Sequence, residues 1–362
     1  MKDRPRHLKF ENDNKLYQEL KCLLNEKIGS LPKSRVNHLK IKVVVYPLIY
    51  FGLYLFGLSQ ANNIGLFLLS FSCMGLMAVI IFCELIHELS HNNIFHRKFH
   101  NKIALKLFDV LGANSFIWQK RHLSLHHHFP NVDGWDADVE QKGPVAIFPN
   151  EESKSIKQHQ HRYIFLLYPL FMLNWLLVRD FRDFFSNKRI IRKAVEIPAI
   201  EYFKLFLFKI MFFCMIIVVP AVFTSASVLQ SIAGLLFLTM SGSMLAMIVL
   251  LTPHINIGNE FPQTDPDGKI NTTWFRHQLI ATNDISNSNW LTRNFMGNFN
   301  FHVVHHLFPN VSSVYAPEAT EVLRSFCEKN DLPYKSYPIS TALKKHYQLI
   351  RKNAITFQEM DL

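Results

Sequence analysis

The sequence predicts an all-α integral membrane protein with four transmembrane helices, interfacial helices and a cytosolic helical cap. Three observations lead to this fold class. Of the 362 residues, 49% are hydrophobic, 32 are phenylalanine, and the mean hydropathy is positive. Four apolar runs each approach the roughly 20 residues that cross a bilayer. The formal net charge is +11, an excess of Lys and Arg that is typical of the cytoplasmic segments of membrane proteins.

Residues 1–42 are polar and basic, and we expect them to form a cytosolic N-terminal segment of short helices on the membrane surface. The apolar runs 43–59 and 64–86 follow, and each is predicted to span the membrane. Only a short uncharged turn joins them, as expected on the outer side. The second span therefore returns to the cytoplasm and carries Glu84, His87 and His91 at its inner end.

Two shorter apolar stretches lie between the first and second pairs of spans. The stretch 103–118 contains Lys106 and Asp109, which favours an interfacial or re-entrant helix. The stretch 163–178 is apolar enough to cross, but basic residues flank it on both sides. If this stretch crossed the membrane, the histidines at 302–306 would also lie on the opposite side of the membrane from those at 87–91 and 122–127. We therefore predict a second interfacial helix.

The runs 205–223 and 228–253 are the third and fourth predicted spans. The polar remainder should contain helices around residues 274–282, 317–329 and 340–352. Residues 43–353 are thus predicted to form one domain, followed by a tail at 354–362. Five cysteines are scattered without C-x-x-C spacing, so neither disulfides nor a thiolate metal site is expected. The basic residues are not interleaved with aromatics on a soluble module, which argues against nucleic-acid binding.

His87-Glu88-Leu89-Ser90-His91 has the spacing H-E-x-x-H, in which two histidines bind zinc and the glutamate acts as a base. Taken alone, this motif would indicate a membrane zinc protease. Two further clusters, His122-Leu123-Ser124-Leu125-His126-His127 and His302-Val303-Val304-His305-His306, have similar spacing. Eight histidines exceed the four ligands that saturate a tetrahedral zinc. They suit two metals in a nitrogen-rich cage, so the sequence favours a dinuclear metal enzyme.

The context of the second cluster is Trp118-Gln119-Lys120-Arg121-His122, continuing through His128-Phe129-Pro130-Asn131 to Asp136-Ala137-Asp138. This stretch resembles the second histidine box of the membrane-bound fatty acid desaturases. The third cluster, within Gly297-Asn298-Phe299-Asn300-Phe301-His302, resembles their third box, most closely in the bacterial front-end, linoleoyl-CoA-desaturase-like branch. Many members of that branch carry Gln where this chain has His302, so the histidine here is a departure that adds a ligand. Pro253-His254 and Trp274-Phe275-Arg276-His277-Gln278-Leu279 also fit, and the similarity runs from about residue 41 to 350.

The resemblance implies a non-haem diiron centre with O2 as co-substrate. It carries eight histidines over as iron ligands: His87, His91, His122, His126, His127, His302, His305 and His306. His254 is a candidate ninth ligand, and His277 is either a ligand or a residue that orients one. No catalytic residue beyond these ligands is predicted. Metal-bound imidazoles usually donate their other N–H to a carboxylate or carbonyl, and for this role we expect Glu88, Asn131, Asp136, Asp138 and Asn300.

The resemblance indicates an enzyme of lipid metabolism, a fatty acyl desaturase of a bacterial inner membrane with its site on the cytoplasmic face. The acyl group could be linked to CoA, to a carrier protein or to a lipid. Electrons should come from an external donor such as a ferredoxin or cytochrome b5, since the sequence has no haem-binding His-Pro-Gly-Gly, dinucleotide fingerprint or iron–sulfur cysteine set. Acyl hydroxylation or acetylenation would use the same boxes. A histidine-rich metal transporter is disfavoured, because its ligands should lie at mid-membrane.

Overall fold

The computed structural model describes residues 8–139, 143–148 and 155–360. Residues 1–7 of the predicted N-terminal segment and residues 361–362 of the predicted tail lie outside this part. The described chain is mostly helical, in agreement with the predicted class, and its only strands are short. Strand β1 (Lys9–Glu11) pairs in parallel with β2 (Lys269–Thr273), and β3 (Asp284–Ile285) pairs in parallel with β4 (Ser336–Tyr337).

Two helical hairpins form the apolar part of the molecule. The first consists of α2 (Asn37–Ser59) and α3 (Ile64–Ile81). The second consists of α12 (Ala199–Phe213), which continues through a π-helical turn (Cys214–Val218) into α13 (Val219–Phe223), and α14 (Val228–Leu251). Three of the four predicted spans lie within a helix that is long and apolar enough to cross a membrane. The fourth, 228–253, extends two residues beyond such a helix, Val228–Leu251.

The two hairpins pack together through glycines where α3 crosses α14. A Cβ added to Gly75 would lie 2.0 Å from the backbone oxygen of Leu238, and one added to Gly242 would lie 2.8 Å from that of Gly75. Ser241 reinforces the contact by donating to the carbonyl of Ser72 at 2.8 Å. Small residues therefore let the two backbones approach closely, which is a common way for apolar helices to associate.

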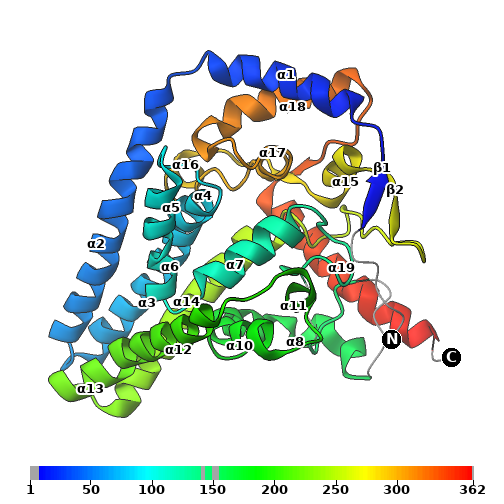
Figure 1. Cartoon of the computed structure of the whole chain (residues 1–362). Coiled ribbons are helices and arrows are strands. Elements are labelled where there is room, and N and C mark those ends of the chain that lie inside the picture. The colour runs from blue at the N-terminus through cyan, green and yellow to red at the C-terminus, as the bar shows by residue number, and fades with distance from the viewer. Residues whose placement is uncertain (1–7, 140–142, 149–154, 361–362) are drawn as a thin grey trace.

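Both hairpin turns lie at the same end of the molecule, at the lower left of Figure 1. The side chain of Gln230, at the start of α14, donates to the carbonyl of Ala61 in the first turn at 2.8 Å. Asn63 and Ser227 cap the helices that leave these turns by accepting from backbone N–H groups. At their opposite ends, α3 and α14 lead into the segments that carry His87 and His254.

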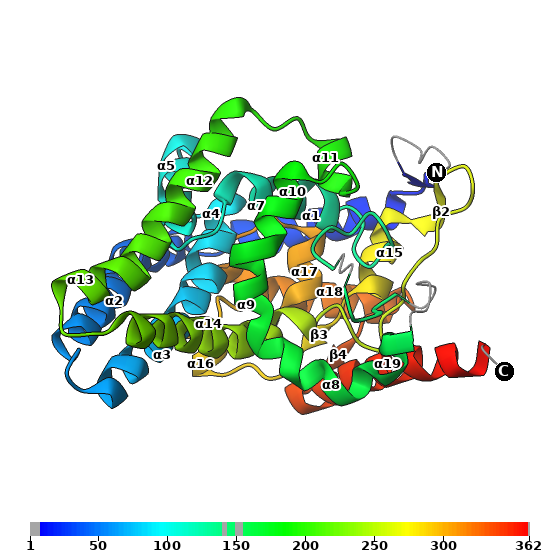
Figure 2. The same cartoon turned by 90° about the horizontal axis from the view of Figure 1, so that it is seen from below.

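A fifth segment, Ile156–Ala194, is also long and apolar enough to cross a membrane, although only 22% of its most apolar window is buried. It is a succession of short helices that Figure 2 shows as a curved run crossing α14. These are a 3₁₀ turn (Ser155–His159), α8 (Gln160–Leu167), a second 3₁₀ turn (Tyr168–Leu170), α9 (Phe171–Asn174), a π-helical turn (Trp175–Arg179), α10 (Asp180–Phe185) and α11 (Ile190–Ala194). By length and composition, the part of the chain that the structure describes therefore contains five candidate spans, one more than the four predicted.

The cap is built from the remaining helices. Between the hairpins in sequence come α4 (His87–Ser90), α5 (Lys98–Leu105), α6 (Leu107–Val110) and α7 (Ser115–Arg121), with π-helical turns at Phe82–Ile86 and His122–His126. The C-terminal part contributes α15 (Trp274–Ala281), α16 (Trp290–Phe295), α17 (His302–Leu307), a 3₁₀ turn (Ser313–Tyr315), α18 (Ala316–Lys329) and α19 (Ile339–Met360). The helices predicted around residues 274–282, 317–329 and 340–352 are thus present.

The N-terminal helix α1 (Lys15–Gly29) is part of this cap, and a 3₁₀ turn (Lys33–Val36) connects it to α2. Figure 1 shows α1 lying along α18 across the top of the molecule. Leu20 and Leu24 are fully buried in the apolar cluster that also contains Val303 and Leu307 of α17. The apolar face of α1 therefore packs on the cap. The expected position of the N-terminal segment on the membrane surface stays a prediction.

Candidate metal centre

Four segments bring histidines to one place beneath the cap. The chain that leaves α3 carries His87 and His91, and the chain that leaves α7 carries His122, His126 and His127. Helix α17 provides His302, His305 and His306. The fourth segment is the turn after α14, which contributes His254. All three sequence clusters and the proposed ninth histidine thus meet in space.

Two of these segments pass through a π-helical turn just where the histidines begin. In the second cluster, the backbone N–H of His127 donates to the carbonyl of His122 at 3.0 Å, five residues earlier. Such single π turns inside α-helices are frequent at functional sites. Here the wider turn brings His122 and His127 into one group of imidazoles while His126 joins another. The spacing of a regular α-helix would not predict that division.

The histidines divide into two groups, and within each group the candidate ligand atoms lie within 4.8 Å of one another. The first group has five members: His87, His91, His122, His127 and His305. The second group has four members: His126, His254, His302 and His306. All nine are buried except His305, which is half-buried. His277 is fully buried but belongs to neither group, and its ring packs on Phe10.

Within each group, ring nitrogens of different histidines face one another. The Nε2 atoms of His254 and His302 lie 2.6 Å apart, and those of His122 and His127 lie 3.0 Å apart. The Nε2 atoms of His87, His91 and His306 are buried without any hydrogen-bond partner. Buried polar atoms normally have partners. Lone pairs that converge in this way need a cation, so the residues fit metal ions bound by neutral nitrogen donors.

The protonation states of the histidines agree with metal binding. Burial lowers the pKa of His91, His127, His254, His302, His305 and His306 well below the usual value of an imidazole. These rings are therefore neutral near pH 7 and can donate a lone pair. His126 differs, because the carboxylates of Asp136 and Asp138 outweigh the effect of burial and raise its pKa.

Carboxylates contact the Nδ1 atoms of two of the histidine rings. The Nδ1 atom of His126 lies 2.9 Å from Oδ1 of Asp136, and that of His122 lies 3.0 Å from Oδ2 of Asp138. Each carboxylate fixes the proton on Nδ1, which leaves Nε2 free to bind a metal. Asp138 is itself held by Arg121, whose Nε donates to it at 2.7 Å.

The other three residues expected to orient the rings have different partners. Glu88 accepts from the Ser312 hydroxyl at 2.8 Å and from the Ser313 N–H at 3.1 Å. Asn131 donates to the carbonyls of His254 and Ala281, and Asn300 donates to that of Ile285. These side chains tie segments of the site together and do not contact a ring nitrogen. Closeness to a histidine in sequence does not determine which way a side chain points.

Sequence reasoning also missed three contributors. Gln278 lies 3.2 Å from Nδ1 of His306 through its Oε1 and donates to the carbonyl of His127 at 3.1 Å. Arg121 and Asp183 form a fully buried ion pair at 2.6 Å behind Asp138. Gln278 and Arg121 each adjoin a histidine in sequence, and that proximity was the available signal. Asp183 offered none, because it lies 62 residues from its partner.

An apolar cavity of about 80 Å³ lies against the histidines. Its walls include ring atoms from both groups, such as those of His122 and His302, together with Phe171, Trp175 and Leu250. A site that combines metal-binding nitrogens with an apolar wall can hold a hydrocarbon next to a metal and away from water.

Comparisons with known proteins agree with this geometry. The family model described as fatty acid desaturase matches residues 62–338, which is most of the chain. The chain is 27% identical over 322 residues to an acyl-lipid (8-3)-desaturase of Physcomitrium patens, a match that covers 86% of this chain and 65% of that protein. It is 25% identical over 264 residues to an sn-1 linoleoyl-lipid 6-desaturase of Synechocystis sp., covering 72% of this chain and 73% of that protein. The chain thus spans somewhat less than two thirds of the Physcomitrium patens protein.

Proposed function

This chain belongs to the fatty acid desaturase family, and on that premise we propose that it is an O2-dependent desaturase that introduces a double bond into a fatty acyl chain. The observation that carries the proposal is the pair of buried histidine groups beside an apolar cavity. The match to acyl-lipid desaturases supports an acyl group linked to a lipid.

We assign one non-haem iron ion to each histidine group. His87, His91, His122, His127 and His305 would hold the first, and His126, His254, His302 and His306 the second. His254 therefore enters the ligand set, and His277 does not. When bound, iron supplies the redox chemistry with O2 that removal of hydrogen from an unactivated methylene requires.

The protein's own groups have three tasks in this proposal. Asp136 and Asp138 keep the Nδ1 protons of His126 and His122 in place, so that Nε2 faces the metal. Gln278 orients His306 in the same way. The aromatic and aliphatic walls of the cavity bind the acyl chain and exclude water from the carbons that react.

We further propose four membrane spans, with the segment Ile156–Ala194 lying in the inner interface. The hydrogen bond between Gln230 and Ala61 supports this arrangement, because both hairpin turns then lie on the same outer side. The histidines would face the cytoplasm of a bacterial inner membrane. An external donor such as a ferredoxin or cytochrome b5 would deliver electrons on that side, where the basic segments 188–193 and 344–352 could attract an acidic protein.

A zinc protease built on His87 and His91 is not favoured. Both histidines belong to a group of five, which exceeds what tetrahedral zinc accepts. Glu88, which would have to act as the base, bonds to Ser312 and Ser313. Acyl hydroxylation and acetylenation would use the same groups, so the product must distinguish them from desaturation.

The test is expression of the full chain, followed by metal analysis and gas chromatography of the cellular lipids. We expect about two irons per chain, little zinc and a new unsaturated acyl product. His305→Ala should abolish the product. His128→Ala is the matched control, because His128 follows the second cluster but is exposed and belongs to neither group. Retained turnover in His305→Ala, or one tightly bound zinc in the wild type, would overturn the proposal.

A further inference from the structure

Two histidines of the second group, His254 and His302, come from segments that are 48 residues apart in sequence. His254 lies in the turn after α14, His302 begins α17, and their Nε2 atoms are 2.6 Å apart. The rings of His122 and His126 have carboxylates at Nδ1, but Nδ1 of His254 is buried without a hydrogen-bond partner. The position of the His254 ring therefore depends on how its backbone is held against α17.

Asn283 holds the turn that carries His254. Its side chain is fully buried, and its backbone N–H donates to the carbonyl of Pro253 at 3.0 Å. Its Oδ1 accepts from the side-chain amides of Asn256 and Asn259 at 2.6 and 2.8 Å. The amide of Asn259 also donates to the carbonyl of His254 itself at 3.1 Å. Asn283 thus contacts this turn both before and after the histidine.

The next residue, Asp284, holds the start of α17. It is buried, and its Oδ1 accepts from the backbone N–H of Val303 at 2.7 Å. Phe301, which precedes the helix, makes no capping bond with its side chain, so Asp284 supplies an acceptor that this helix end lacks. The hydroxyl of Tyr334 donates to Oδ2 of Asp284 at 2.6 Å, and the N–H of Asp284 donates to the carbonyl of Lys335 at 2.9 Å. These two bonds fix Asp284 to the segment before β4.

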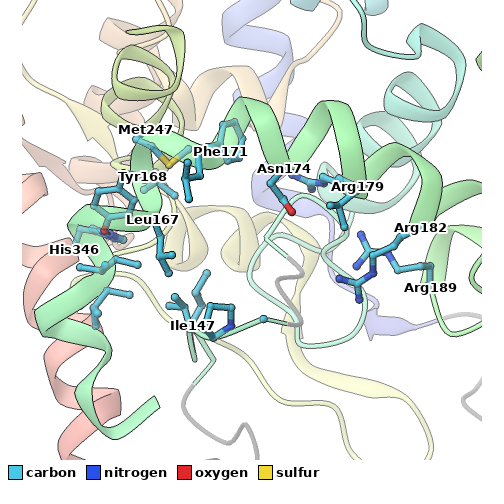
Figure 3. Close-up of a pocket in the computed structure, with 18 residues that line it drawn as sticks. Ile147, Leu167, Tyr168, Phe171, Asn174, Arg179, Arg182, Arg189, Met247 and His346 are labelled. Carbon is cyan, nitrogen blue, oxygen red and sulfur yellow. The ribbon is translucent and has the colours of Figure 1, made fainter. Parts of the chain in front are cut away.

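A residue of α19 contacts the turn after α14 as well. Nδ1 of His346 lies 2.6 Å from the carbonyl oxygen of Ile255. The hydroxyl of Tyr168 donates to Nε2 of His346, and Figure 3 shows these two side chains next to each other. These contacts connect the turn to α19 and to the 3₁₀ turn that contains Tyr168. Asn283 and Asp284 have a different effect, because two adjacent residues connect the turn to α17.

We propose that Asn283 and Asp284 are positioning residues that hold His254 and His302 in the relative placement that the second iron requires. This inference rests on the proposed function, since it takes one iron in each histidine group. Three of the four histidines of the second group lie on these two segments, whereas only one of the five in the first group does. Loss of either side chain should therefore weaken iron binding mainly in the second group, by about tenfold or more.

The test observes each iron by spectroscopy, so that it does not depend on turnover. The purified full-length protein is loaded with iron enriched in its Mössbauer-active isotope. Groups of five and of four histidines should give two different quadrupole doublets of equal area. His254→Ala and His91→Ala assign the doublets, because each variant removes a histidine from one group only.

Asp284→Ala and Asn283→Ala should each lose the doublet that His254→Ala loses and keep the other one. Asp284→Asn retains an oxygen that can accept from the N–H of Val303, so it should keep both doublets. Tyr334→Phe removes only the hydroxyl that fixes Asp284 and changes the fold least. It should weaken binding of the same iron, which keeps the proposal testable if the alanine variants do not fold.

Gln160→Ala is the control for a general loss of stability. Gln160 is fully buried and bonds to the backbone of Ala146 and Ile350. This variant should lower the Tm and keep both doublets. Two retained doublets in Asp284→Ala and Asn283→Ala, or equal loss of both doublets, would refute the positioning role while the proposed function stands. Fewer than two irons in the wild type would instead refute the proposed function, and this inference with it.

Discussion

Individual side chains behind the histidines determine which ring nitrogen faces inward. Asp136 is fully buried, and its carboxylate accepts from the backbone N–H of Asn131 as well as facing His126. It therefore connects the loop after the second cluster to the ring of His126. Loss of a partner of this kind typically lowers metal affinity or activity by about 10- to 100-fold.

Asp136→Asn should lower iron content and desaturation by about 10- to 100-fold, because the amide can no longer fix the proton on Nδ1 of His126. Metal analysis and product formation measure both effects. Asp133→Asn removes an exposed carboxylate from the same loop and should change neither. Full iron content and activity in Asp136→Asn would show that this carboxylate has only a structural role.

His277 provides a prediction on pH. Burial lowers its pKa to about 4, from 6.5 for an exposed imidazole. Between these two pH values, the unfolded chain therefore binds more protons at this residue than the folded chain does. The contribution of the neutral His277 ring to the free energy of unfolding is complete above about pH 6.5 and is lost as the pH falls toward 4. The full difference is on the order of 3 kcal/mol.

Thermal unfolding in detergent at several pH values tests the direction of this pH dependence. The Tm of the wild type should fall more steeply from pH 7 to pH 5 than that of His277→Gln. The exposed His128 serves as the control, and His128→Gln should follow the wild type. Identical slopes for the wild type and His277→Gln would mean that folding does not lower the pKa of His277.

Among the elements, α1 has the least expected role. It supports α17 from above, since Leu20 and Leu24 pack in the same cluster as Val303 and Leu307. The hydroxyl of Tyr17 also donates to the carbonyl of Leu307 at 3.3 Å. The third histidine cluster is therefore held partly by a helix that lies almost 300 residues away in sequence.

Leu24→Ala should destabilise the protein by about 2–5 kcal/mol, the usual cost of a cavity in a packed core. It should also lower iron content, because α17 loses its support. Leu23 is the neighbouring residue and is 43% exposed, so Leu23→Ala should have little effect on either quantity. Equal Tm values for the two variants would show that α1 is not part of the cap core.

The contact between α3 and α14 yields a second prediction for the elements. Gly75→Ala would put a methyl group 2.0 Å from a backbone oxygen of α14, so the two helices must separate. We expect a loss of at least about 1–3 kcal/mol, visible as a lower Tm and lower expression. Gly52→Ala in α2 meets no atom within 4 Å and should be neutral. A neutral Gly75→Ala would mean that the two helices can adjust more easily than their packing indicates.

At the scale of the whole molecule, the number of spans determines on which side each turn lies. With four spans, Asn62 and Ser225 both lie outside; with Ile156–Ala194 as a fifth span, Ser225 moves inside. In a cysteine-free variant, Asn62→Cys and Ser225→Cys should both react with a membrane-impermeant thiol reagent in intact cells, since both positions are exposed. Labelling of position 62 without position 225 would establish the fifth crossing.

The sequence by itself determined the helical class, the apolar runs and the three histidine clusters, because hydropathy and residue spacing are local properties. Each of the four predicted spans matches one candidate helix, the last of which ends at Leu251, two residues before the predicted end. Helix α18 begins and ends within one residue of the prediction, because Pro317 marks the first turn of a helix. Local patterns also identified Asp136 and Asp138, which follow the second cluster closely.

Only the tertiary structure decided how the histidines are divided, which side chains hold them and what lies beside them. His126 joins His254, His302 and His306, although its sequence neighbours belong to the other group. Asp183 supports the site from 62 residues away, and α1 supports it from the other end of the chain. The apolar cavity beside the histidines likewise arises where distant segments meet. These features depend on contacts between segments that are far apart in sequence, and no local pattern of residues encodes such contacts.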